Sequence, residues 1–323
     1  MATGGDQDGG KDQVPRNMNS LLQSFIELSK DQDQPASLAP MTDERRQFLE
    51  NAFHNLEAHD PIKVMLEDIK VILESGETDD DKQKKELALD DLQMHVEDMD
   101  LANDFYKISG YALFNPLLNS SHSGYRWRTA ELIATLAQNN SYSQQCLLDA
   151  GVFPSLIKML EKDDNEMAKV KAIYAISCLC REFPPAREVF LKDLDGFSVL
   201  VRAIQSDVEK VQTKASFMLA ALCTEVPEYR ETLIHMGLLE QLIGMLHQPH
   251  STCHEHLMRT LLLLCEDNNQ SQAECQRPEL GLSQLLKQRL VLLDGKDEYQ
   301  EEYDHASKLQ QLVFQGQHGE VER

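Results

Sequence analysis

The sequence predicts an all-α fold, an armadillo-like right-handed helical solenoid with capping helices at its N- and C-terminal ends. Two interleaved series of residues carry this prediction. A small or apolar residue recurs inside helical runs at spacings of 42, 42, 43 and 42: Ala88, Ala130, Ala172, Ala215 and Leu257. A glycine follows each of them, at spacings of 41, 45, 41 and 44: Gly110, Gly151, Gly196, Gly237 and Gly281. A helical period in the low forties is typical of stacked armadillo or HEAT repeats, which build long binding surfaces.

The N-terminal tail is the first element, and we expect residues 1–40 to be flexible. Within it, residues 16–29 carry apolar side chains at the spacing of an amphipathic helix: Met18, Leu21, Leu22, Phe25 and Ile26. The flanking sequences are polar. Two interpretations stay open on pattern alone: the segment docks on this protein's own domain, or it binds a partner.

The repeat domain is expected over residues 41–313. Thr42 with Asp43 and Glu44 predicts a helix start, and the apolar stripe of that helix runs to Leu56. Asp60 followed by a proline predicts the next start, and Gly76 the end of that helix. We expect the charged run 77–85 to be a solvated loop. These first helices form the N-terminal cap.

Each repeat is expected to hold a long helix, a short helix that leads to the glycine, and a third helix after it. In the second repeat these segments are 126–138, 143–150 and 153–162. The glycine is best explained as a helix stop with positive φ. After the last glycine a helix runs to Asp294, a final helix over 298–314 caps the fold, and residues 314–323 form a disordered tail.

Composition limits the classes of function. The 323 residues carry a net charge of −23, which disfavours nucleic acid and anionic membranes as partners. The seven cysteines lie mostly in apolar helical runs, as expected of reduced thiols. No secretory signal is visible, and no run approaches the roughly 18 apolar residues of a membrane span. We therefore expect a cytosolic, monomeric protein.

Catalytic motifs are not found in the sequence. It has no glycine-rich phosphate loop, no GxSxG and no HExxH. The segment 253–256 (CHEH) looks like a group of metal ligands, but it has no matching ligands elsewhere and opens a long helix. We interpret it as a polar helix start. The sequence thus predicts no enzyme, no metal and no cofactor.

A partner-binding groove is the expected functional site, because the longest helices of such a stack line its concave face. The side chains that point outward beside the buried positions of these helices are Arg128, Glu131, Thr135, Lys171, Tyr174, Ser177, Lys214, Phe217 and Arg259. The same stripe passes Thr213 and Ser216. Half-exposed aromatic rings are typical anchors for a protein partner. Alternatively, Tyr174 and Phe217 pack between neighbouring repeats.

Several separated segments resemble the Hsp70-binding protein family. They are 126–139 (RWRTAELIATLAQN), 175–179 (AISCL), 194–200 (LDGFSVL), 277–282 (RPELGL), 298–302 (EYQEE), 40–47 (PMTDERRQ) and part of 16–23. The resemblance covers about 16–313. It implies an armadillo-type nucleotide exchange factor whose concave face grips the nucleotide-binding domain of a cytosolic 70-kDa heat-shock chaperone, so that ADP leaves.

The resemblance also implies that the tail segment occupies the chaperone's peptide-binding site and assists client release. The residues concerned are Arg16, Asn17, Leu21, Leu22 and Phe25. The alternative is an armadillo adaptor that binds a chaperone or a ubiquitin ligase without exchange activity. A nucleotide-release assay separates the two.

Overall fold

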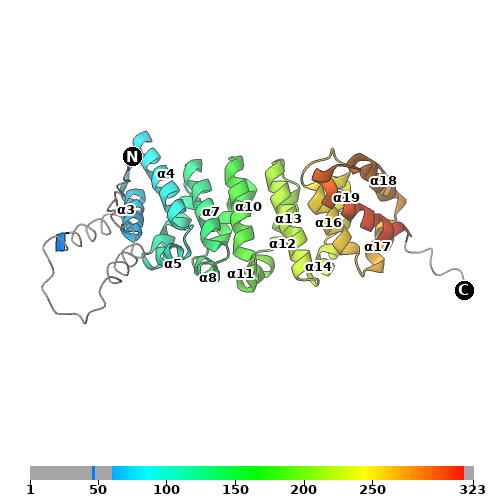
Figure 1. The fold of residues 1–323 in the computed structure, drawn as a ribbon, viewed down its shortest axis with the longest axis horizontal. Coiled ribbons are helices and arrows are strands. Elements are labelled where there is room, and N and C mark those ends of the chain that lie inside the picture. The colour runs from blue at the N-terminus through cyan, green and yellow to red at the C-terminus, as the bar shows by residue number, and fades with distance from the viewer. Residues whose placement is uncertain (1–45, 48–59, 316–323) are drawn as a thin grey trace, which may run out of the picture.

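The computed structural model describes residues 46–47 and 60–315, and its secondary structure within these ranges is helical. The predicted tail 1–40 lies outside the described residues, as do 316–323 and most of the predicted helix before Leu56. None of the described helices is long and apolar enough to span a membrane. The helices stack side by side along one axis (Figure 1).

The stack consists of repeating three-helix layers, as predicted. The long helices are α4 (Asp79–His95), α7 (Ser123–Ala137), α10 (Glu166–Cys180), α13 (Glu209–Glu225) and α16 (His254–Cys265). The short helices are α5 (Met99–Lys107), α8 (Ser141–Asp149), α11 (Pro184–Glu188), α14 (Tyr229–His235) and α17 (Asn269–Cys275). The third helices are α6 (Phe114–Leu118), α9 (Phe153–Lys162), α12 (Gly196–Ile204), α15 (Leu238–Leu246) and α18 (Leu282–Leu293).

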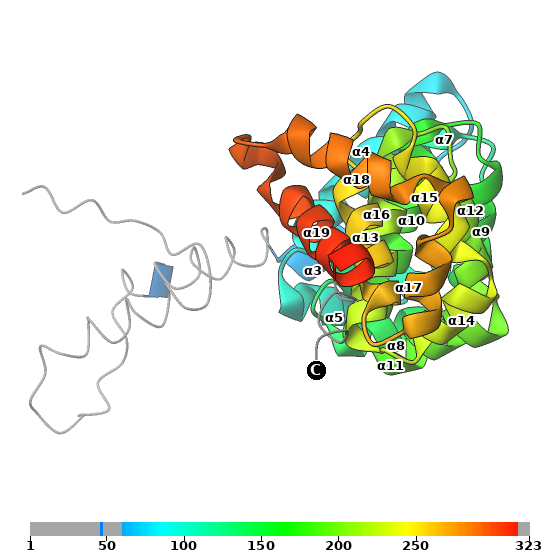
Figure 2. The same cartoon turned by 90° about the vertical axis from the view of Figure 1, so that its right-hand side faces the viewer.

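The two ends of the stack differ from the layers. Helix α3 (Pro61–Glu74) packs on α4 at the N-terminal end, and α19 (Gln300–Gln310) packs on α16 and α18 at the other (Figure 2). Short 3-10 and π turns complete the path: η1 (Gly110–Leu113), η2 (Val189–Asp193), η3 (Pro278–Leu280), η4 (Asp297–Tyr299) and η5 (Gln311–Gln315).

The core runs through the middle of the stack without interruption. The five small or apolar landmarks of the sequence, Ala88 to Leu257, are all buried. Alanine at four of these positions lets the long helices approach one another closely. All seven cysteines are buried free thiols, as the sequence predicted.

The start of α4 corrects one expectation. Residues 79–85 form the first turns of this helix, with Thr78 as its N-cap, rather than a solvated loop. The Thr78 hydroxyl accepts a hydrogen bond from the backbone of Asp81, whose carboxylate bonds back to the Thr78 backbone. This capping box satisfies two free donors at the helix start. The start at Asp60 is as predicted, and its side chain accepts from the Ile62 amide.

The recurring glycines have two different structural roles. Gly151, Gly237 and Gly281 have positive φ values of 65°, 70° and 62°, as predicted. Gly110 and Gly196 do not; there the preceding Ser109 and Asp195 adopt the left-handed conformation.

Close packing explains why Gly110 and Gly196 are glycines. A Cβ on Gly110 would lie 2.3 Å from the Phe105 ring, and one on Gly196 would lie 2.6 Å from the Phe190 carbonyl oxygen. The prediction of positive φ is therefore wrong at these two positions. Glycine is required there because an aromatic residue fills the space of its side chain.

Side chains from the short helices cap the C-terminal ends of the long helices. The Gln144 amide on α8 donates to the carbonyls of Cys178 and Arg181 at the end of α10, both at 2.9 Å. Arg230 on α14 and Gln272 on α17 do the same at the ends of α13 and α16. These bonds satisfy carbonyls that a helix end leaves free and join the short helices to the long ones.

Candidate partner-binding groove

The long helices present one continuous face, on which the predicted stripe lies. We call it the ladder face and define it by the nine predicted residues from Arg128 to Arg259. These side chains are half-buried except Phe217, which is 39 % exposed. Thr213 also lies at this surface, but Ser216 is fully buried, so its prediction as a stripe residue is wrong. Ser216 faces inward because it adjoins Ala215, the centre of the buried side of α13.

Contacts between neighbouring long helices cross the N-terminal half of the ladder face. The Arg128 guanidinium on α7 reaches back to α4, with Nε 2.8 Å from Asp90 and a second nitrogen 3.3 Å from Glu86. Lys171 on α10 pairs with Glu131 on α7. Thr135 accepts a hydrogen bond from Gln93 of α4. The predicted residues of this half are thus occupied in holding layers together.

The C-terminal half of the ladder face holds aromatic rings and cations. The Lys214 ammonium lies 4.7 Å from the centre of the Tyr174 ring on the preceding long helix. The Arg181 guanidinium lies 5.7 Å from the centre of the Phe217 ring. The His256 ring of α16 meets the other side of Phe217 edge-on at 5.2 Å. Both aromatic rings therefore bridge repeats, and Phe217 keeps an exposed edge as well.

Three cations in this half have no carboxylate oxygen within 4.0 Å among the described residues: Arg181, Lys214 and Arg259. Arg259 donates instead to the Thr224 hydroxyl at 3.2 Å. Burial, with the ammonium groups of Lys171 and Lys210 nearby, lowers the pKa of Lys214. Arg181 is exposed and the other two are half-buried, so this part of the surface presents cations without carboxylate partners on a protein of net charge −23.

A small cleft lies between α10 and α13 in the same region. It measures about 20 Å³ and is lined by Ser177, Cys180, Arg181, Phe217, Met218, Ala221, Leu222 and Glu225. The sequence stripe missed two residues here, Arg181 and His256. Arg181 lies four residues after Ser177, one helical turn further along the same face, and His256 lies three before Arg259. Helical spacing could have found both.

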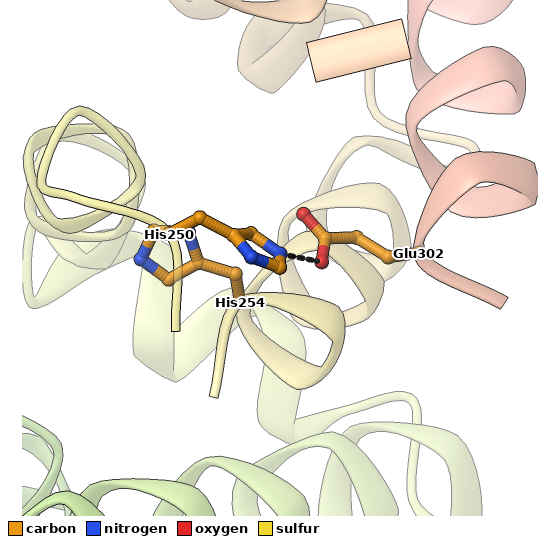
Figure 3. A group of neighbouring side chains, drawn as sticks. All are labelled: His250, His254 and Glu302. Atoms are coloured by element: carbon orange, nitrogen blue, oxygen red, sulfur yellow. Dashed lines mark hydrogen bonds and ion pairs between the residues drawn. The ribbon is translucent and has the colours of Figure 1, made fainter. Parts of the chain in front are cut away.

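A second group of polar side chains lies at the C-terminal end. Nitrogen and oxygen atoms of His250, His254 and Glu302 lie within 4.8 Å of one another, as in a possible metal centre (Figure 3). Helix α16 begins at His254, as the polar helix start predicted, but the His254 side chain is buried.

Arg289 supplies the positive charge of this group. One guanidinium nitrogen lies 2.8 Å from His254 Nδ1 and 3.1 Å from the Glu302 carboxylate, and another donates to the Leu246 carbonyl at 2.9 Å. His250 Nε2 lies 2.8 Å from the other Glu302 oxygen. A metal ion at this place would have to displace the guanidinium. We therefore interpret the group as a buried hydrogen-bonded cluster that joins α19 to α16 and α18.

The chain is similar in sequence to Hsp70-binding proteins and nucleotide exchange factors. Residues 101–234 match the model of the SIL1/FES1/HPBP1 C-terminal domain, and residues 18–105 match that of the nucleotide exchange factor Fes1. Hsp70-binding protein 1 of Rattus norvegicus is 38 % identical over 94 % of this chain and 88 % of its own length. The Homo sapiens protein of that name is 38 % identical over 93 % and 86 %.

Solved structures agree on the fold. A designed armadillo repeat protein superposes with a TM-score of 0.61 at 18 % identity, over 77 % of this chain and 99 % of its own. At this identity the likeness concerns the fold alone. Together with the helix order, it identifies an armadillo-like solenoid.

Proposed function

The chain belongs to the SIL1/FES1/HPBP1 family, and from this membership we propose that it is a nucleotide exchange factor for a cytosolic 70-kDa heat-shock chaperone. In this proposal the ladder face is the concave surface that binds the chaperone's nucleotide-binding domain. Binding promotes release of ADP. The protein makes and breaks no bond, so it is a co-chaperone rather than an enzyme.

The observation that carries the proposal is the similarity to Hsp70-binding protein 1 along nearly the whole chain. The chemistry of the ladder face supports it. Phe217 offers an exposed aromatic edge, and Arg181, Lys214 and Arg259 offer charges with no carboxylate partner among the described residues. Exposed aromatic and arginine side chains are the residue types that anchor protein interfaces.

The mechanism requires only a difference in binding free energy. The ladder face would select a position of one lobe of the chaperone domain that bound ADP resists. A tenfold loss of ADP affinity corresponds to about 1.4 kcal/mol. A small misfit between the lobe position and the nucleotide site is enough to supply it.

The test is release of a fluorescent ADP from the isolated nucleotide-binding domain of a cytosolic 70-kDa chaperone, with excess ATP as the chase. The expected result is a release rate that rises at least tenfold at saturating concentrations of this protein. Tight binding with an unchanged release rate would overturn the exchange assignment and identify an adaptor.

The N-terminal segment has a separate role in this proposal. Residues 16–29 would occupy the peptide site of the intact chaperone and assist client release, as the resemblance implies. The domain division follows: a tail over 1–40, the repeat domain over 41–313 and a short tail after it. We retain a ubiquitin ligase only as a further candidate partner.

A further inference from the structure

A second exposed aromatic surface lies away from the ladder face. Among the described residues, three aromatic side chains are more than a third exposed: Phe217, Tyr106 at 46 % and Tyr142 at 45 %. Tyr106 on α5 and Tyr142 on α8 meet edge-on, with ring centres 6.0 Å apart. Met99, seven residues before Tyr106 on the same face of α5, is 57 % exposed.

The position of this tyrosine patch, defined as Met99, Tyr106 and Tyr142, separates it from the proposed chaperone site. Helices α5, α8, α11 and α14 follow one edge of the stack, at the ends of the long helices (Figure 1). Behind the patch, the Tyr106 ring meets the buried Tyr111 ring edge-on at 5.4 Å. The patch is therefore a rigid aromatic surface supported by the core, and it is a suitable anchor for an apolar segment.

We propose that the amphipathic segment 16–29 of this chain docks on the tyrosine patch when no chaperone is bound. Its apolar side chains Leu21, Leu22 and Phe25 would cover the two rings and Met99. The segment would thus be stored on its own domain and become available when the chaperone's peptide site competes for the same stripe. This inference goes beyond the proposed exchange function; docking itself is independent of it, and only the release by the chaperone rests on the proposed role of the tail.

Charge complementarity favours this occupant. The rim of the patch carries Glu97 and Asp100, both exposed and without a cation within 4.0 Å among the described residues, and Lys107, which pairs with Asp104. The segment carries Arg16 near its start and Glu27 near its end, and Lys30 follows it, so residues 16–30 have a net charge of +1. The cations Arg16 and Lys30 would face the acidic rim while the apolar stripe covers the rings.

Reach is consistent with docking. Residues 30–59 separate the segment from the start of α3. The helix predicted over 42–56 would be about 22 Å long, and the remaining residues, as flexible chain, would span about 20 Å on average. Helix α3 packs directly against α5, which carries two of the three patch residues. The other exposed apolar pair, Val291 and Leu292 on α18, lies at the opposite end of the stack (Figure 1).

The surface of α3 and α4 is the strongest competitor. It exposes Leu66 and Leu73 on α3, and Leu87 and Met94 on α4. The predicted apolar stripe of residues 48–56 lies just before the start of α3 in the chain. It is therefore the nearer candidate to cover the surface of α3 and α4. The tail segment needs a different site, and the tyrosine patch is the remaining apolar surface within reach.

The experiment uses the full chain with Tyr142 replaced by the photoreactive residue p-benzoylphenylalanine. Irradiation of the dilute monomer should produce intramolecular crosslinks to residues 16–30, mapped by mass spectrometry. The same residue placed at Phe217, an aromatic position of similar exposure on the ladder face, is the matched control and should crosslink to the tail at least fivefold less.

Substitutions in the tail keep the test independent of folding. The pair Leu21→Ser and Phe25→Ser should reduce the crosslink yield from position 142 at least fivefold, and neither residue belongs to the helical stack described above. Failure of position 142 to crosslink to 16–30, or a yield that the two serines leave unchanged, would overturn the proposal. ADP release from the isolated chaperone domain should be unaffected by these serines, so a failure here is distinguishable from a failure of the exchange function.

Discussion

Lys214 and Phe217 lie on successive turns of α13 and provide the cleanest test of the ladder face. We expect Lys214→Glu to weaken binding to the chaperone domain about tenfold or more, because a cation without a carboxylate partner is replaced by an acid. Phe217→Ala should cost about 2 kcal/mol or more of binding free energy if the ring is a true anchor. Both are measured by titration calorimetry.

The matched control for Lys214→Glu is Lys192→Glu. Lys192 is an exposed lysine on η2 that pairs with Glu188. Its reversal should leave binding unchanged, and surface changes of this kind seldom alter stability by more than about 0.5 kcal/mol. Equal losses from both reversals would show that net charge, rather than the ladder face, controls binding. Arg128 is a poorer probe, because its pairs with Asp90 and Glu86 hold α7 to α4.

We expect the folded protein to lose stability in acid because of His254. Burial, with Arg289 and His250 nearby, lowers the pKa of His254 to about 4 from 6.5. The neutral ring accepts from Arg289, and the protonated ring cannot. Because the folded pKa lies below the unfolded one, the contribution is complete above pH 6.5 and is lost as the pH falls toward 4.

Urea unfolding at about pH 7.5 and about pH 5 measures this effect. The wild-type midpoint should fall on acidification by more than that of His254→Gln, since the glutamine oxygen can accept from Arg289 without titrating. The Glu302 carboxylate, which faces the guanidinium, and His250, which faces that carboxylate, are the same in both proteins. Parallel shifts in the two proteins would place the acid sensitivity elsewhere.

At the scale of elements, Gly151 and Gly196 separate two reasons for a glycine between helices, a positive φ and a lack of space for a side chain. Gly151 has a φ of 65°, and a Cβ added to it would have no other heavy atom within 4 Å. Gly151→Val should therefore destabilise the fold by about 1 kcal/mol or more through strain alone. Gly151→Asn should cost less, because asparagine tolerates this conformation. Thermal or urea unfolding measures both.

Substitutions at Gly196 should destabilise the fold for a different reason, a steric clash rather than backbone strain. Its φ is not positive, but a Cβ would lie 2.6 Å from the Phe190 carbonyl oxygen. Asparagine therefore gives no relief there, and Gly196→Ala and Gly196→Asn should both be costly. A tolerant Gly196 beside an intolerant Gly151 would contradict the distinction between close packing and strain.

The same elements show what the sequence could predict. The repeat, the helix order and the buried landmarks follow from spacing alone, because each layer has the same packing problem. The role of Gly196 could not be predicted, since it depends on where the Phe190 backbone passes. The start of α4 was predictable in principle, because Thr78 and Asp81 form a local capping box, although the surrounding charges are equally typical of a solvated loop.

For the site, helical spacing predicted which side chains share the ladder face. It could not show that Arg128 and Lys171 are paired across layers, whereas Lys214 has no carboxylate partner among the described residues. Pairing depends on the lateral distance between neighbouring long helices, which no single helix specifies. The spacing also assigned Ser216 to the surface, one position away from the exposed Phe217.

At the scale of the whole molecule, we expect the tail and the stack to act separately. Deletion of residues 1–35 should leave ADP release from the isolated nucleotide-binding domain unchanged and weaken client release from the intact chaperone. Fluorescent ADP and a fluorescent client peptide measure the two steps in parallel. Loss of ADP release on deletion would refute this division of roles.

Exchange also requires a reciprocal effect on binding. If this protein lowers the chaperone's affinity for ADP, then ADP must lower the chaperone's affinity for this protein by the same factor. Calorimetry should therefore find the tightest complex with the nucleotide-free domain and a weaker one as ADP is added. Equal affinity for the nucleotide-free and ADP-saturated domains would falsify the exchange assignment.

The separation along the chain of residues that touch in space has a consequence for how fast the protein folds. Gln144 bonds residues 34 to 37 positions away, about one repeat. Closing such loops costs entropy that grows only with the logarithm of their length, and mostly local contacts favour rapid folding. Among the described hydrogen bonds, that of His250 with Glu302 spans the longest segment, 52 residues. Folding can therefore spread from layer to layer, and the bond that closes the C-terminal end carries the largest closure entropy.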